Sequence, residues 1–220
     1  MQVPYPAAAW TMRLLAQTAG YLDRVPTFQE QREVLKSVAT SLKRESIPFA
    51  LAGGYAVWAR GGPESDHDVD FVVRPEDADA ARKVLLRDGH DPVESNEDWL
   101  DKVGLDGIIV DVIHRLPIGE VDEDMFARCD MLSVDSVRML VMRPTELLLC
   151  RLLPLGENAC DFAPLLGWSR SLREQIDWPA VRRETARNPF ARAFLGLLED
   201  LEVISTELNP SVPGVVDDAQ

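Results

Sequence analysis

Apolar and polar residues recur along the chain with two different periods, which separate predicted helices from predicted strands. Apolar residues three and four positions apart predict helices, whereas short apolar runs bounded by glycine or charged residues predict strands. Helices are predicted over 6–22, 28–45, 75–88 and 122–130, with a helical turn over 55–60. Strands are predicted over 47–52, 68–73, 99–103, 107–114 and within 131–142. This alternation favours a mixed sheet flanked by helices.

Local signals support several of these boundaries. Thr27 and Glu30 form a capping-box pattern at the start of the helix over 28–45. Pro75 suits the first position of the helix over 75–88, and Gly89 suits the turn that follows it.

Beyond Arg143 and Pro144 only helical patterns remain. They are predicted over 144–154, 158–173, 178–187 and 189–206, and a polar segment over 209–220 is predicted to be disordered. We therefore expect an α/β (α+β) fold with three parts: a core over 1–143 including N-terminal helices, a helical region over 144–208, and a tail over 209–220.

The charge of the chain is negative and uneven. The formal net charge is −14, which argues against unaided binding to a nucleic-acid backbone. Residues 91–130 carry twelve acids and three bases, whereas 168–192 carry six arginines and three acids. A basic face in this second stretch and a solvated pair of amphipathic helices both remain open.

Several classes of protein are disfavoured. No stretch approaches the roughly 18 uninterrupted apolar residues of a membrane span, and the N-terminus does not match a secretory signal peptide. We therefore expect a cytoplasmic protein. Three widely spaced cysteines, Cys129, Cys150 and Cys160, are expected to be buried and reduced. Trp99, Trp168 and Trp178 are expected to pack in the core.

The residues that indicate chemistry begin with Asp68 and Asp70 in the predicted strand over 68–73. Residues two apart in a strand project from the same face, so the two carboxylates lie together. Adjacent carboxylates resist ionising together unless a cation lies between them. Hard oxygen ligands on one rigid strand suit Mg²⁺, which takes one or two carboxylates and substrate phosphates.

Two further features fit this site. Gly53 and Gly54 end a predicted buried strand, where the absence of Cβ atoms lets a phosphate approach the backbone. Asp111 interrupts the β-branched run over 108–113, and burying it ionised would be costly. A place beside Asp68 and Asp70, where a cation compensates its charge, removes that cost. A nearby basic side chain, such as an arginine, is the alternative partner.

Ala52-Gly53-Gly54, then Asp68-Val69-Asp70-Phe71, then Asp111 resemble the motif of nucleotidyltransferases of the DNA polymerase β superfamily. Within that superfamily the sequence is similar to AbiEii-type toxins, which act on tRNA, and to aminoglycoside and lincosamide nucleotidyltransferases. The resemblance implies transfer of a nucleoside monophosphate from a nucleoside triphosphate to an acceptor hydroxyl, with release of pyrophosphate. It also implies one or two Mg²⁺ ions.

The resemblance also assigns roles. Asp68, Asp70 and Asp111 would be the catalytic and metal-binding residues. The residues expected to bind the nucleotide are Gly53, Gly54, Tyr55, Arg60 and Arg151, with Ser65, His67 and Asp161 as accessory residues. Arg74 is a further cation that would contact the triphosphate.

The acceptor stays open at this point. The arginines over 170–192 would favour tRNA, in a toxin whose partner is an antitoxin protein. The acidic stretch over 91–130 would favour a cationic small molecule. A non-catalytic binding protein with the same fold is the third alternative, although three intact carboxylates argue against it.

Overall fold

The computed structural model describes residues 25–65 and 68–205. The helix predicted over 6–22 and the predicted tail lie outside these residues. Within them, a seven-stranded sheet has the order β3-β4-β5-β2-β1-β9-β8. Its strands are β1 (Phe49–Leu51), β2 (Val69–Val73), β3 (Asp91–Val93), β4 (Leu100–Leu105), β5 (Ile108–Ile113), β8 (Asp130–Val134) and β9 (Val137–Val141). The pairs β2/β5 and β1/β9 are parallel and the others antiparallel, so the expected mixed sheet is confirmed.

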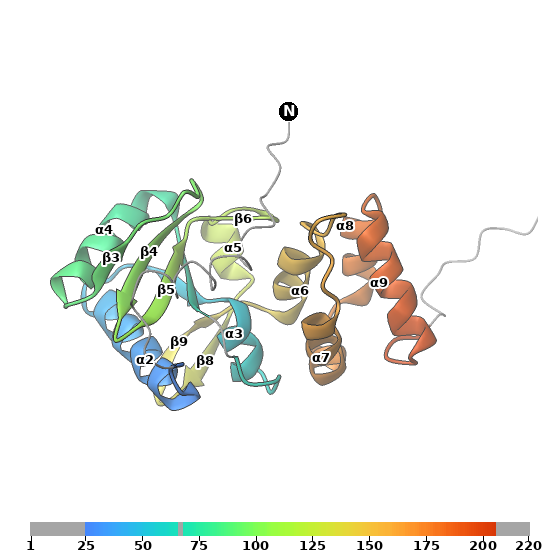
Figure 1. Ribbon diagram of the computed structural model, residues 1–220, viewed down its shortest axis with the longest axis horizontal. Helices are drawn as coiled ribbons and strands as arrows, with labels where there is room; N and C mark the ends of the chain where they lie inside the picture. The colour runs from blue at the N-terminus through green and yellow to red at the C-terminus, as the bar shows by residue number, and fades with distance from the viewer. Residues whose placement is uncertain (1–24, 66–67, 206–220) are drawn as a thin grey trace, which may run out of the picture.

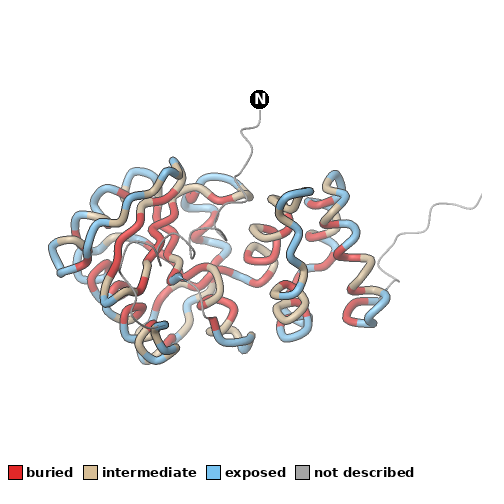
Figure 2. Tube along the Cα trace, viewed as in Figure 1, coloured by how far each residue is buried: buried red, intermediate tan, exposed pale blue. Residues whose placement is uncertain are grey.

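Helices α2 (Phe28–Arg44) and α4 (Pro75–Arg87) pack together on one face of this sheet. The capping box that starts α2 is formed, with the Glu30 amide donating to Thr27 Oγ1 and the Thr27 amide donating to a Glu30 carboxylate oxygen. Gly89 has the positive φ of 96° expected after α4. The central strands β1, β2 and β5 are almost wholly buried, whereas β3 and β8 at the edges of the sheet are largely exposed or half-buried (Figure 2).

Two short elements connect the sheet to the rest of the chain. Helix α3 (Gly53–Ala59) follows β1 directly, and it packs on both β2 and the later helix α6. Helix α5 (Glu123–Ala127) begins at Asp122, whose side chain accepts a hydrogen bond from the Met125 amide. A small hairpin of β6 (Arg115–Leu116) and β7 (Gly119–Glu120) was not predicted, nor was edge strand β3.

From Pro144 onward the described chain is helical apart from one isolated bridge between Gly156 and Ala159. Its helices are α6 (Pro144–Leu152), α7 (Ala163–Leu172), the 3₁₀ helix Arg173–Gln175, α8 (Trp178–Thr185) and α9 (Pro189–Asp200). They lie beside the sheet at the right of Figure 1. Helix α7 begins later than predicted, and α9 ends earlier because Glu202 adopts a positive φ of 55°. No helix among the described residues is long and apolar enough to cross a bilayer.

Candidate active site

Two neighbouring strands, β2 and β5, bring the predicted acids together. In the parallel pair β2/β5, Asp70 lies opposite Asp111. Asp68 immediately precedes β2, so it lies on the same side as Asp70. The structure thus places the three predicted carboxylates in one cluster, with Asp68 half exposed and Asp111 buried.

Lys102 joins this cluster and was missed by the sequence analysis. It lies on β4 directly opposite Asp111, and its Nζ is 2.5 Å from Asp111 Oδ1 and 3.8 Å from Asp68 Oδ2. The hairpin register puts it there. Asp106 and Gly107 have φ values of 52° and 80°, as a two-residue type I′ turn requires, and Leu105 pairs with Ile108.

The pairing of Lys102 with Asp111 could therefore have been predicted from the sequence. An Asp-Gly pair between two apolar runs predicts a two-residue turn, and counting back from it pairs residue 102 with residue 111. The two strands were predicted, but their register was not worked out.

Burial and mutual repulsion shape the charges of the cluster. Burial raises the pKa of Asp70 to about 8, and the negative charges of Asp111 and Asp68 act in the same direction. Burial also raises the pKa of Asp111, to about 6, although the Lys102 ammonium opposes that change. Burial alone would lower the pKa of Lys102, but the charge and hydrogen bond of Asp111 outweigh it and raise that pKa. The cluster favours any further cation that would offset the carboxylate charge.

The backbones of Gly53 and Gly54 each lie very close to another side chain, that of Asp70 and that of Ser65 respectively. Gly53 has a φ of +56°, and a Cβ atom there would lie 1.7 Å from Asp70 Oδ2. A Cβ atom at Gly54 would lie 2.3 Å from Ser65 Oγ. Only glycine fits at these positions without movement of Asp70 or Ser65. Gly53 also lines the cavity described next, whereas Gly54 packs against the buried Ser65.

A cavity of about 650 Å³ lies between the sheet and the helical region. Gly53, Asp70 and Asp111 line it from the sheet side, and Arg151 and Asp161 line it from the other. The remaining lining is mostly apolar, from residues such as Trp99, Ile113, Leu116, Leu147, Leu155, Leu165 and Trp168. A volume of this size is typical of sites for small molecules, which span about 300–1,000 Å³.

Arg151, on α6, is the predicted cation that the structure brings to the cavity. Its guanidinium carbon lies 5.5 Å from the centre of the Trp168 ring, which is a cation–π distance. Burial lowers the pKa of Arg151, while the negative charges of Asp70 and Asp161 oppose that change. Trp99 and Trp168 are half-buried and pack against the core as expected, but both also line the cavity. Trp178 is buried as expected.

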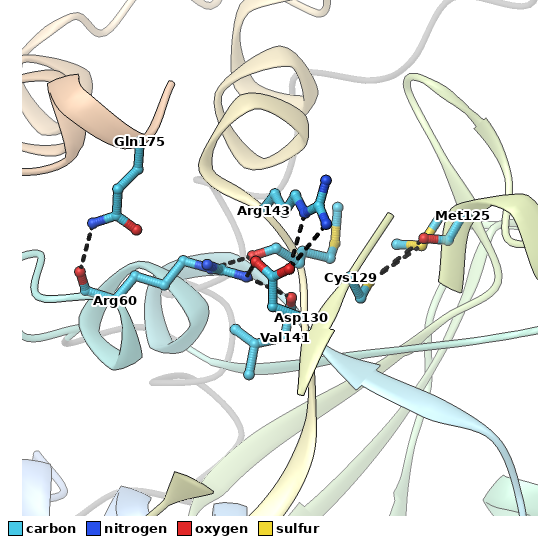
Figure 3. A network of polar contacts seen from close by, with 8 residues as sticks. Arg60, Met125, Cys129, Asp130, Val141, Arg143 and Gln175 are labelled. Carbon is cyan, nitrogen blue, oxygen red and sulfur yellow. Dashed lines mark hydrogen bonds and ion pairs between the residues drawn. The ribbon is translucent and has the colours of Figure 1, made fainter. Parts of the chain in front are cut away.

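Arg60 was predicted to bind the nucleotide, yet it is not among the residues that line the cavity. Its side chain is instead held in a network of polar contacts (Figure 3). Its Nε donates to the Met142 carbonyl oxygen at 2.6 Å, and its Nη2 donates to Asp130 Oδ2 at 2.9 Å and to the Val141 carbonyl at 2.8 Å. Gln175 Nε2 donates to the Arg60 carbonyl at 3.1 Å. Arg60 therefore ties α3 to the end of β9 and to the helical region.

Tyr55 and Arg74 were also predicted to contact the nucleotide, and neither lines the cavity. The Tyr55 side chain is fully buried and stacks on Phe28 at 5.8 Å, so it packs in the core. Arg74 pairs with Asp77 and Glu123 on the surface. His67 lies outside the described residues.

The three cysteines differ in exposure. Cys129 is buried, and burial raises its pKa to about 12. Cys150 lines the cavity but is half buried, and burial raises its pKa to about 12 as well. Cys160 is exposed at the cavity, so the expectation that all three thiols are buried is wrong for it. The loop that precedes α7 carries Cys160 outward.

Whether the cluster suits a divalent ion depends on the type and placement of its carboxylates. Asp68 and Asp70 fit such an ion, because they supply carboxylate oxygens from adjacent positions of one chain segment. Asp70 also lies near the negative charges of Asp111 and Asp68, which a cation would offset. Asp111 Oδ1 already accepts a hydrogen bond from Lys102 Nζ. Over residues 25–65 and 68–205, no three acidic, histidine or cysteine side chains form a ready ligand group for a metal.

The sequence matches no protein-family model and no curated protein. Solved structures do match. The solution structure of the antibiotic-resistance factor ANT(2'')-Ia aligns with a TM-score of 0.55 and 12% identity, over 80% of this chain and 97% of that chain. The lincosamide antibiotic adenylyltransferase LnuA, in its lincomycin-bound crystal structure, has a TM-score of 0.46 and 11% identity, over 61% and 91%.

A putative nucleotidyltransferase from Thermotoga maritima has a TM-score of 0.41 and 19% identity, over 50% of this chain and 75% of that chain. The matches to LnuA and to the Thermotoga maritima protein have TM-scores below 0.5, so no conclusion rests on them. At 12% identity, the match to ANT(2'')-Ia bears on the fold alone. It shows that this chain shares the fold of ANT(2'')-Ia. In this chain Asp70 and Asp111 lie on adjacent parallel strands, and Gly53 begins α3.

Proposed function

We propose that the chain is a magnesium-dependent nucleotidyltransferase that transfers a nucleoside monophosphate to a hydroxyl group of a small molecule. One observation carries this proposal: in a nucleotidyltransferase fold, Asp70 and Asp111 line a cavity of about 650 Å³, with Asp68 beside them. Perturbed carboxylates that converge on a cavity are typical of catalytic sites.

The reaction forms a bond between the acceptor oxygen and the α-phosphorus and breaks the bond to the β-phosphate, so pyrophosphate leaves. Asp68 and Asp70 would hold Mg²⁺, which when bound neutralises the charge that develops on the phosphates. Asp111 would accept the proton of the acceptor hydroxyl as general base. Arg151 is a half-buried cation at the cavity and would contact the triphosphate. Because Gly53 has no Cβ atom, it leaves room for the Asp70 carboxylate beside it.

The choice of a small acceptor rests on two observations. The cavity lining is mostly apolar and aromatic, with Asp161 as an added acid. Three of the six arginines that would favour tRNA pair with acids: Arg173 with Glu174, Arg182 with Glu199 and Arg183 with Glu184. The fold neighbour ANT(2'')-Ia is an antibiotic-resistance factor, which agrees with a small acceptor.

The test is transfer of α-labelled nucleotide from each of the four triphosphates, with Mg²⁺, onto a panel of aminoglycosides and lincosamides and onto bulk tRNA. Asp70→Asn should lower transfer by more than about 100-fold, since even outer-shell changes at metal sites cost about 10–100-fold. Asp101→Asn, on β4 and outside the cavity lining, is the matched control and should keep full activity.

Label on a small molecule that disappears in Asp70→Asn supports the proposal. Label on tRNA alone would instead support the toxin-like alternative, whose expected partner is an antitoxin. Full activity of Asp70→Asn would contradict the assignment of the site, and failure to bind any triphosphate would leave a non-catalytic protein with this fold.

A further inference from the structure

Lys102 occupies an unusual place for a lysine, in the middle of a sheet and among carboxylates. It is only 9% exposed, whereas the side chain of Lys83 on α4 is 71% exposed and pairs with Asp79 at the surface. The type I′ turn at Asp106-Gly107 holds β4 in register with β5, so Lys102 faces Asp111 across the strand pair. Its position is thus set by the backbone and not by a mobile loop.

The Lys102 ammonium lies between two carboxylates that come from different strands. Its Nζ is 2.5 Å from Asp111 Oδ1 and 3.8 Å from Asp68 Oδ2. In two-metal sites the ions are about 3.5–4 Å apart and are clamped by shared carboxylates. An ion that bridges these two oxygens, with Mg–O distances of about 2.0–2.1 Å, would lie against this ammonium, and the two positive charges would repel each other.

We propose that Lys102 serves as a built-in cation in place of a second divalent ion, so that the site binds a single ion through Asp68 and Asp70. This inference rests on the proposed function. Asp111 then faces the ammonium instead of a metal, and the hydrogen bond from Lys102 fixes the orientation of its carboxylate. Lys102 is therefore a positioning residue, which acts through Asp111.

The number of bound ions tests this inference without any acceptor or turnover. We would titrate the full-length protein with Mn²⁺, in the presence of a saturating non-hydrolysable triphosphate analogue, and measure free Mn²⁺ by electron paramagnetic resonance. The analogue's own Mn²⁺ binding is measured without protein and subtracted. The wild-type protein should bind one Mn²⁺ per chain.

Lys102→Met removes the ammonium and leaves Asp68 and Asp111 without it, so this variant should bind two Mn²⁺ per chain. Lys102→Gln is a second neutral variant that keeps a hydrogen-bond donor for Asp111, and it should also bind two if Lys102→Met does not fold. Lys102→Arg retains the charge and should bind one. Lys83→Met is the matched control and should bind one.

Each outcome is decisive. Two ions bound by the wild type would overturn the inference while leaving the proposed function intact. One ion bound by every folded Lys102 variant would show that the lysine does not exclude the second ion, and would also overturn it. Failure of the wild type to bind Mn²⁺ would overturn the proposed magnesium-dependent function, and this inference with it.

Discussion

Asp70 and Asp111 are carboxylates that the fold holds close together on neighbouring strands, although burial and repulsion oppose their ionisation. The arrangement is unfavourable for the stability of the protein without metal, but it suits a site that receives a cation. Stability and chemistry therefore place opposite demands on these residues. At the scale of single residues, this conflict can be measured.

Asp70→Asn should raise the stability of the metal-free protein, and the gain should depend on pH. The pKa of Asp70 is about 8 in the folded protein against an ordinary value of 3.8, so ionisation opposes folding increasingly as pH rises through this window. The gain is therefore largest at pH 8 and above and vanishes near pH 4. At pH 8 we expect at least about 1 kcal/mol, or about 2–4 °C in Tm.

Thermal unfolding in the presence of EDTA, at pH 5 and pH 8, measures this gain. Asp101→Asn is again the control, and it should show no comparable change between the two pH values. An equal gain at both pH values, or a loss at pH 8, would show that the charge of Asp70 is not the source of the instability.

The exposure of Cys160 gives a second prediction at this scale. The raised pKa values of Cys129 and Cys150 leave almost no thiolate at neutral pH, so only Cys160 should react rapidly with Ellman's reagent in the native protein. All three thiols should react in urea. Cys160→Ser should remove the fast phase, and two fast thiols in the wild type would contradict the structure.

At the scale of elements, Asn188 connects α9 to the end of α6, a helix that lines the cavity. Its Oδ1 accepts from the amides of Phe190 and Ala191 at the start of α9. Its Nδ2 lies 3.0–3.3 Å from the carbonyl oxygens that follow or end α6, those of Leu152, Leu153 and Leu155. The Asn188 side chain thus provides hydrogen-bond partners both for carbonyl groups at the end of α6 and for amide groups at the beginning of α9.

Asn188→Ala should lower stability by about 2 kcal/mol, because it removes a helix cap and leaves carbonyl groups without their donor. For a chain of this length that loss corresponds to about 4–8 °C in Tm. Urea unfolding followed by circular dichroism gives the free energy. Asn96→Ala, at an exposed position, should change it by less than about 0.5 kcal/mol, and an equal loss in both variants would refute the capping role.

At the scale of the whole molecule, the cavity is built from both the sheet and the helical region. The buried hydrophobic residues form one cluster that extends from Leu35 on α2 to Leu198 on α9. Arg60 adds polar links between α3, β9 and the helical region (Figure 3). Residues from both parts therefore share one core and one site.

We expect the protein to unfold in a single calorimetric transition. A triphosphate with Mg²⁺ at 100 times its Kd should stabilise that whole transition by about 2.7 kcal/mol. This shift should be absent in Asp70→Asn. Two transitions, of which the ligand moves only one, would show that the sheet and the helical region unfold independently.

Much of this architecture follows from local signals in the sequence. The capping box at Thr27, the glycine after α4 and the apolar runs of β2 and β5 are each decided by residues close together in the chain, so they predicted the elements correctly. The period-two spacing of Asp68 and Asp70 is local in the same way. Edge strand β3 escaped prediction because it is three residues long and contains Pro92.

The tertiary structure decided which distant residues meet. Arg60 and Arg151 are both arginines on predicted helices, yet one binds backbone carbonyls of the sheet and the other lines the cavity. Lys102 reaches Asp111 through strand register, and Cys160 reaches the cavity through a loop. Capping, turn and period-two patterns depend on neighbours along the chain and can be read from it. The partner of a buried charge depends on how strands and helices pack, and that is settled only when the chain has folded.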